Sequence, residues 1–131
     1  MSSLKVKMQL TAIAESAYEI IKVPFENDIR QAYGAISDWI NAAADIVDTV
    51  DQEYESIKSD FSEVKSCLIS LRVACGIVKN RVAQLEQYAK ESAIYVQDGA
   101  SPVQQSGEQL TQTTNKIRRL TRTVGPGQMA A

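Results

Sequence analysis

Apolar residues recur through the middle of the chain at alternating steps of four and three positions. Every member of this series except one serine is apolar, and its phase is kept over the whole span. A seven-residue repeat of this kind forms one apolar stripe along a helix, and over many heptads it is typical of a left-handed coiled coil. The series, called the central seam below, consists of Ile29, Tyr33, Ile36, Ile40, Ala43, Val47, Val50, Tyr54, Ile57, Phe61, Val64, Leu68, Leu71, Cys75, Val78, Val82, Leu85, Ala89, Ser92 and Val96.

The length of the central seam predicts one very long helix over about residues 26–97, because no clear stop signal interrupts the pattern. Such a helix would be about 100 Å long at 1.5 Å per residue. The alternative is two or more bundle helices that stay in register across a hidden break. The best site for a break is segment 60–63, whose sequence DFSE has the form of a capping box, and Gly76 is the second.

A shorter helical pattern precedes the central seam. Apolar residues spaced by four and three positions between Val6 and Ile20 predict a helix over about residues 3–22, capped by one of the two serines at its start. Pro24 separates this helix from the next one, because its ring removes a backbone donor and disfavours a helical residue before it.

Another helix is predicted after the central seam. Ser101 followed by Pro102 is typical of a helix start, so we expect a helix over about residues 102–124. Its apolar stripe is thinner and more polar than the central seam, with serine and threonine at some inward positions. Residues 125–131 are expected to form a frayed tail.

The apolar stripe of the long predicted helix is wide at its ends and narrow in the middle. Extra apolar residues flank it near Trp39 at one end and near Ile69 and Val73 at the other, whereas none lies off the seam between Val47 and Ser66. A wide stripe indicates a helix with two or more neighbours, and a narrow stripe indicates a thin coiled coil. We therefore expect bundle-like ends and a stalk-like middle.

The middle of the seam is the predicted interaction surface. If the two short helices fold back over the ends of the long one, the mid-seam stays uncovered and each side chain forgoes about 1.5–3 kcal/mol of burial. We therefore predict a single all-α domain over residues 1–131, an elongated coiled coil or bundle of three helices (short, very long, short) that self-associates. The predicted interface with a second copy or another helical protein is Val47, Val50, Tyr54, Ile57, Phe61, Val64, Leu68 and Leu71.

Charge is segregated along the chain, although the net charge is only −2. Residues 26–63 carry ten acidic and two basic groups, whereas residues 64–97 carry five basic and two acidic groups. The acidic run lacks the glycine and the spacing of a calcium loop, so we interpret it as a solvated face. The last helix adds a basic cluster, which the predicted fold keeps away from the acidic run of its own chain, so we predict pairing between subunits. This cluster is Lys116, Arg118, Arg119 and Arg122.

The sequence offers little for catalysis. The chain contains no histidine, the commonest general base and a ligand of most zinc and di-iron sites. We therefore predict no enzyme activity, no catalytic residue, no metal and no cofactor. Cys67 and Cys75 lie about 12 Å apart along one predicted helix, too far for a disulfide, and they are interpreted as small seam residues. Trp39 is interpreted as part of the core.

No stretch has the roughly 20 apolar residues of a membrane-spanning helix, and the start lacks a signal-peptide pattern. We expect a soluble protein; the free cysteines favour a reducing intracellular compartment, and export without a signal peptide stays open. The leading hypothesis is a structural or scaffold subunit of a filament, a secretion apparatus or a viral particle. The alternatives are an export or assembly chaperone or adaptor that binds a partner's amphipathic helix, and a nucleic-acid-associated accessory protein that uses the basic cluster.

Overall fold

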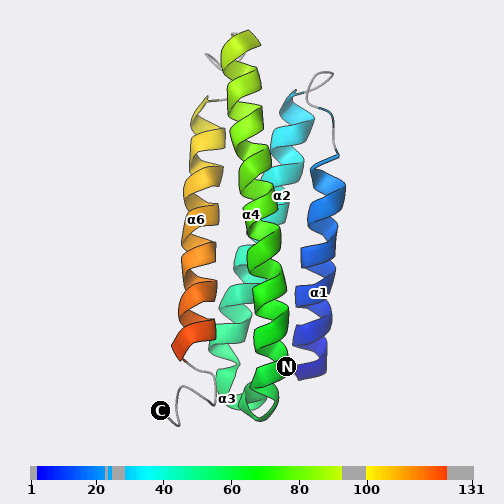
Figure 1. Cartoon of the computed structure of the whole chain (residues 1–131), viewed down its shortest axis with the longest axis vertical. Helices are drawn as coiled ribbons and strands as arrows, with labels where there is room; N and C mark the ends of the chain where they lie inside the picture. The colour runs from blue at the N-terminus through cyan, green and yellow to red at the C-terminus, as the bar shows by residue number, and fades with distance from the viewer. Residues whose placement is uncertain (1–2, 23, 25–28, 93–99, 124–131) are drawn as a thin grey trace.

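The computed structural model describes residues 3–22, 24, 29–92 and 100–123. Four long helices contain most of these residues. A short helix and a 3-10 turn connect the second long helix to the third (Figure 1). The predicted all-α class is confirmed, and the two flanking helices closely match their predicted ranges. The predicted tail lies outside the described residues. The elements are α1 (Ser3–Ile20), α2 (Ile29–Gln52), α3 (Tyr54–Ile57), η1 (Lys58–Asp60), α4 (Phe61–Ser92) and α6 (Ala100–Thr123).

The predicted single helix over residues 26–97 is wrong, because the chain reverses direction between α2 and α4. The backbone leaves helical geometry at Glu53, with φ −97° and ψ 13°, and at Ile57, with φ −114° and ψ 0°. The reversal lies directly before and partly within segment 60–63, the first of the two break sites considered. The second site, Gly76, lies inside α4 and interrupts nothing.

The reversal keeps the heptad phase, and for that reason it does not show in the pattern. Eight residues, 53–60, separate α2 from α4, and Tyr54 and Ile57 occupy seam positions within them. Ile57 and the first residue of α4, Phe61, still point inward, and both are almost fully buried. The Tyr54 ring meets the Phe61 ring edge to face, with centroids 5.3 Å apart. Apolar packing thus closes the turn from inside.

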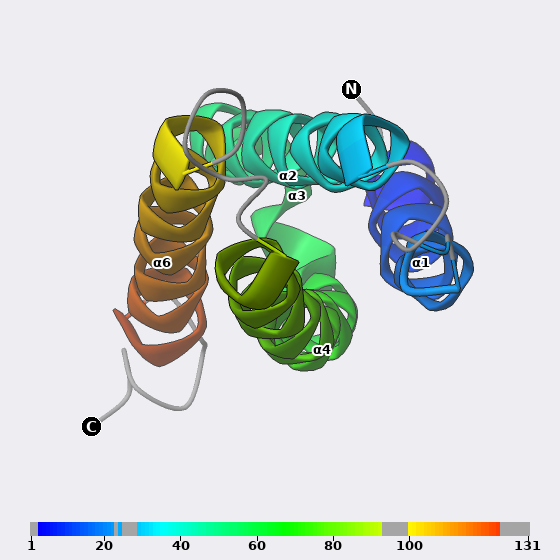
Figure 2. The same cartoon turned by 90° about the horizontal axis from the view of Figure 1, so that it is seen from above.

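The helices run alternately up and down and occupy the corners of a square whose order is α1, α2, α6, α4 (Figure 2). The reversal spans a diagonal, so α2 and α4 stand at opposite corners. Each outer helix, α1 or α6, packs against both α2 and α4. As a result, α1 is antiparallel to α2 and parallel to α4, and α6 is antiparallel to α4 and parallel to α2.

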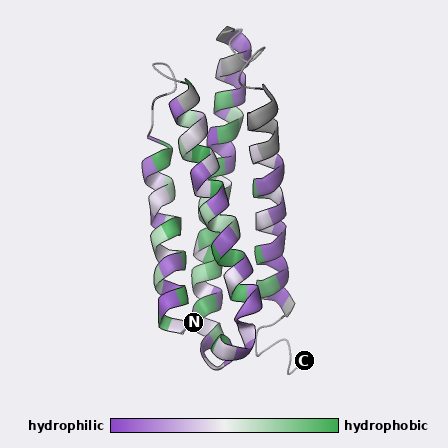
Figure 3. Cartoon of the chain, turned by 180° about the vertical axis from the view of Figure 1, so that it is seen from behind, coloured by the Kyte–Doolittle hydropathy of each residue, from purple (hydrophilic) through white to green (hydrophobic). Residues whose placement is uncertain are grey.

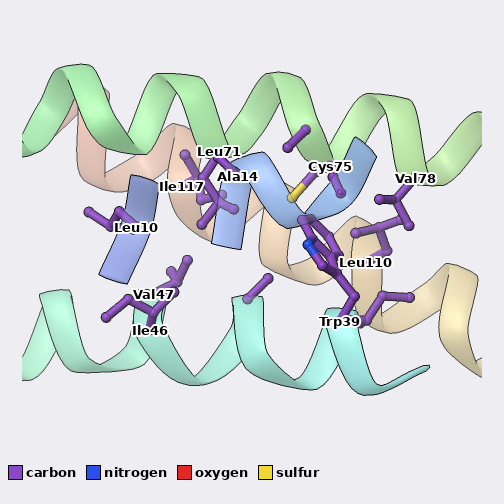
Figure 4. Packing of buried hydrophobic residues seen from close by; sticks show 14 of the residues in the cluster. Leu10, Ala14, Trp39, Ile46, Val47, Leu71, Cys75, Val78, Leu110 and Ile117 are labelled. Carbon is purple, nitrogen blue, oxygen red and sulfur yellow. The ribbon is translucent and has the colours of Figure 1, made fainter. Parts of the chain in front are cut away.

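The interior is one apolar cluster to which all four helices contribute (Figure 4). Leu10 comes from α1, Trp39 from α2, Leu71 from α4 and Ile117 from α6. The Trp39 indole N–H donates to the carbonyl oxygen of Ile13 at 2.8 Å, which confirms the predicted core position of this tryptophan and satisfies its polar atom. Hydrophilic residues alternate with hydrophobic ones along each helix, as expected for amphipathic helices (Figure 3).

The polar stripe predicted for the last helix is confirmed. α6 buries Thr113 and Thr121 beside Leu110 and Ile117. The Thr121 hydroxyl donates to the carbonyl oxygen of Ile117 at 2.9 Å, so its polar atom is paired within the helix. The predicted cap at Ser101 is displaced, because the helix already begins at Ala100.

The predicted interface residues are buried inside a single chain, so the premise that a monomer leaves them uncovered is wrong. The reversal folds the two halves of the seam towards each other, and α1 and α6 then cover them from both sides. Tyr54 is half-buried, and each of the other residues is exposed to 1% or less. These others are Val47, Val50, Ile57, Phe61, Val64, Leu68 and Leu71.

Truncating Phe61 tests this packing. We expect Phe61→Ala to lower the free energy of unfolding by about 3–5 kcal/mol, because it empties a buried site next to the reversal. Urea denaturation followed by circular dichroism measures the change. Tyr18→Ala, which removes a half-exposed ring of α1, is the control and should cost about 1 kcal/mol or less. Equal losses for the two variants would contradict the structure.

Candidate interaction surfaces

A polar contact joins the parallel helices α2 and α6. The Lys116 ammonium donates to Asp48 Oδ1 at 2.6 Å and lies 3.5 Å from Asp51 Oδ2. Two turns away, Gln109 Nε2 donates to Asn41 Oδ1 at 2.9 Å. In both contacts the residue of α6 follows the residue of α2 by 68 positions. The hydrogen bond to Asp48 is the main reason that the pKa of Lys116 lies above its ordinary value.

A similar polar contact joins the parallel helices α1 and α4. The Ser3 hydroxyl donates to Asp60 Oδ2 at 2.6 Å, and Lys7 Nζ donates to Glu63 Oε2 at 2.7 Å. The hydrogen bond to Glu63 raises the pKa of Lys7. The acidic end of the α2–α4 hairpin is therefore held from both sides, by one lysine of α1 and one of α6.

These contacts correct the predicted role of the basic cluster. The cluster was expected to reach the acidic run only in another subunit, yet Lys116 pairs with Asp48 and Asp51 of its own chain. The reversal explains the difference, because it brings the acidic run alongside the end of α6. Arg119 is exposed and lines a groove that also contains Asp48 and Lys116. Arg118 and Arg122 are exposed as well.

The two cysteines occupy different environments. Cys75 is buried between α4 and α6, and this burial raises the pKa of its thiol to about 11, although a hydrogen bond with Thr114 partly opposes the shift. Such a thiol is a packing group, as predicted. Cys67 is half-buried, and its sulfur lies 3.8 Å from the Thr11 hydroxyl oxygen on α1. Both thiols are free.

Tyr33 carries the one buried side-chain polar atom without a hydrogen-bond partner among the described residues. Its ring packs against the core from α2, while its hydroxyl lacks an acceptor. Burial, and secondarily the charge of Glu86 on α4, raise the pKa of this phenol. The hydroxyl therefore stays protonated and contributes no charge at neutral pH.

Large apolar side chains that remain exposed in the described structure belong to α1 and α4 alone. The wide stripe at this end of the long predicted helix indicated two or more neighbours, and α4 does contact α1, α6 and α2. Ile69 and Val73 nevertheless stay 38% and 56% exposed. The exposed apolar residues of α1 are Leu4, Met8 and Tyr18. They were not recognised from the sequence, although Leu4 and Met8 are four residues apart and therefore lie on one side of a helix.

The exposed apolar residues of α4, Ile69 and Val73, belong to a second heptad series that faces outward. Its members are spaced by four and three positions, all are exposed, and none is charged. At Gly76 a Cβ atom would meet open space, so packing within the chain does not require this glycine. This series, called the outer seam below, consists of Ser62, Ser66, Ile69, Val73, Gly76 and Asn80.

Comparison with known protein families, curated proteins and solved structures found no match for this chain. Within the described ranges, no group of acidic or cysteine side chains is arranged to hold a metal ion. None of the described helices is long and apolar enough to cross a membrane.

Replacing Lys116 by methionine tests the α2–α6 contact. The lysine is 28% exposed and its partners are about half exposed, so we expect Lys116→Met to lower the free energy of unfolding by about 0.5–1 kcal/mol at pH 7 and low salt. Because folding raises this pKa above 10.5, the contribution is complete below pH 10.5 and is lost as the pH rises through the folded value.

Chemical denaturation at 50 mM and 1 M NaCl measures this difference, which should shrink at high salt because screening weakens the pair. Lys90→Met is the matched control, since Lys90 is exposed and forms no ion pair with another described residue. If Lys116→Met lowers the free energy of unfolding by the same amount at both salt concentrations, the ion pair contributes nothing to stability.

Proposed function

We propose that this chain is a non-catalytic helical subunit that self-associates to build a larger structural assembly. The observation that supports this proposal is the outer seam of α4, an uncharged heptad series on the surface of a helix whose inner side is already buried. Apolar heptads are the pattern by which helices pack together. The outer seam is thus a packing surface without an occupant in the single chain.

A second copy is the occupant that the outer seam fits best. In a symmetric dimer the same surface meets itself, so like charges near the two-fold axis come close together. None of the six outer-seam residues is charged, over a length of about 27 Å. Its serines and Gly76 are small, which lets two helices approach closely, while Ile69 and Val73 supply the apolar contact at its centre.

An antiparallel arrangement uses these residues most efficiently. When two α4 helices cross about a two-fold axis midway along the outer seam, Ile69 of each copy meets Val73 of the other. Tyr18 of α1 lines a groove together with Val73, so the apolar surface continues onto α1, where Leu4 and Met8 are exposed as well. Burying these side chains, each now 38–64% exposed, supplies the driving force for association.

The non-catalytic part of the proposal rests on the sequence, which contains no histidine and no phosphate-binding glycine loop. A filament, a secretion apparatus and a viral particle are the kinds of assembly in which such a subunit would serve. In each of them the bundle is the building block and its surfaces are the working parts.

One observation favours a second function, an export or assembly chaperone or an adaptor. A groove runs between α1 and α4 and is lined by Thr11, Ala14, Glu15, Tyr18, Ser70, Val73 and Ala74, so polar and apolar side chains both face it. A partner's amphipathic helix binds its receptor by laying its apolar side into a groove between helices. In that case the outer seam would be covered by a different protein.

Introducing a charge into the outer seam tests self-association. We expect Val73→Glu to weaken dimerisation at least tenfold, about 1.4 kcal/mol, because two carboxylates would be brought into one apolar contact. Sedimentation equilibrium over a concentration series measures the dissociation constant. Gln112→Glu adds the same charge to the exposed side of α6 and should leave dimerisation unchanged.

The thermal midpoint of Val73→Glu should stay close to that of the original chain, because Val73 is 56% exposed in the single bundle. A chain that sediments as a monomer at every concentration, with or without Val73→Glu, would refute self-association through the outer seam.

A further inference from the structure

Five cationic side chains lie on α4 and α6, and one of them, Lys79, lines the groove between these helices. Those of α4 recur every seventh residue and therefore share one side of the helix over about 21 Å. Those of α6 lie one turn apart. None of the five forms an ion pair with another described residue. This basic strip consists of Lys65, Arg72, Lys79, Arg118 and Arg122.

The packing of α4 against α6 places the two halves of the strip side by side. Lys79 of α4 and Thr111 of α6 line one groove, which shows the register of these antiparallel helices. Two turns closer to the start of α4, and two turns closer to the end of α6, this register places Arg72 beside Arg118. The strip is thus continuous across both helices.

The basic strip lacks the opposite charges that would balance it. Glu86 and Glu108 line the groove only at the end beyond Lys79. Cations on neighbouring turns repel one another, and this cost disappears when an acidic surface lies against them. The strip is therefore suited to bind an anionic partner.

An acidic surface with a matching repeat lies on α2 of the same chain. Asp38 and Asp45 are seven residues apart on its outward side. Both are exposed, and neither forms an ion pair with another described residue. The seven-residue step, about 10.5 Å, equals that of Lys65, Arg72 and Lys79 on α4. These two aspartates are called the acidic ridge below.

The ridge cannot reach the strip of its own chain. Helices α2 and α4 stand at opposite corners of the bundle (Figure 2), and the two aspartates of the ridge are exposed on the side of α2 opposite its buried residues. We propose that the basic strip of one copy binds the acidic ridge of a second copy. This inference shares with the proposed function the idea that the partner is another copy of the chain. It does not depend on the outer seam, which consists of other residues.

The contact joins two unlike surfaces, so each copy keeps a free strip at one side and a free ridge at the other. Such heterologous contacts continue without closing unless the rotation happens to form a ring. Charge pairing therefore gives growth in one direction, while the outer seam pairs copies symmetrically. Together the two contacts produce an extended assembly.

Nucleic acid fits the strip less well than the ridge does. Proteins that follow single-stranded nucleic acid combine cations with aromatic side chains on which bases stack, and the strip has no aromatic member. The chain as a whole is also acidic, with a net charge of −2. The ridge, in contrast, matches the strip in both charge and spacing.

Charge reversal tests the proposal, with the Val73→Glu background used to remove the outer-seam contact. One variant reverses the ridge (Asp38→Lys with Asp45→Lys), and the other reverses the strip (Arg72→Glu with Lys79→Glu). In 50 mM NaCl we expect each variant alone to associate at least tenfold more weakly than the Val73→Glu parent. An equimolar mixture of the two should regain the association of the parent, because each reversed surface then meets its complement.

Sedimentation velocity measures the size distribution, and 500 mM NaCl should disperse the parent and the mixture alike. Circular dichroism should show the same helix content in all variants, since the four substituted residues make no ion pair with described residues. Association that survives both reversals, or a mixture that stays dispersed, would overturn the proposal. Binding of a fluorescent single-stranded oligonucleotide that Arg72→Glu with Lys79→Glu abolishes, without association of the parent, would assign the strip to nucleic acid instead. Loss of the outer-seam dimer alone leaves these results unaffected.

Discussion

The whole structure depends on closing the central seam upon itself. A continuous apolar stripe from α2 through α4 has to be buried, and one straight helix can be covered only by other chains or by its short flanking helices. The reversal between Glu53 and Phe61 solves this problem within one molecule, because both halves of the stripe then face a common interior. The positions of α1 and α6 follow from it. Each of them covers an exposed side of the α2–α4 hairpin and touches both of its arms.

The same reversal determines the surface of the molecule. It brings the acidic hairpin end between two lysines, so Lys7 and Lys116 pair with carboxylates that are far away in sequence. It separates the remaining charges, leaving acidic residues on the outward side of α2 and cations between α4 and α6. It also leaves the outer side of α4 uncharged and partly apolar. The surfaces available to partners are thus different from those that a straight helix would offer.

Much of the fold could be predicted from the sequence, and the reversal could not. The ranges of α1 and α6, the core position of Trp39 and the inward direction of the central seam all follow from local periodicity and turn signals. The reversal escaped detection because apolar residues at the seam positions Tyr54, Ile57 and Phe61 carry the phase through it. Periodicity reports which side of a helix is apolar, and it carries no information about the direction of the axis. The pairing of Lys116 with Asp48 and the burial of the middle of the seam within one chain depend on that direction, so periodicity did not predict them.

A distance between α2 and α4 is the most direct test of this account. Gln31→Cys and Gln84→Cys, both at exposed positions, carry spin labels in a chain whose native thiols are removed by Cys67→Ser and Cys75→Ala. Diluting labelled chains with unlabelled ones restricts pulsed electron resonance to distances within one molecule. Two helices at opposite corners of a bundle predict a label separation of about 30 Å. A separation of about 80 Å, the length of a continuous helix between these positions, would contradict the account.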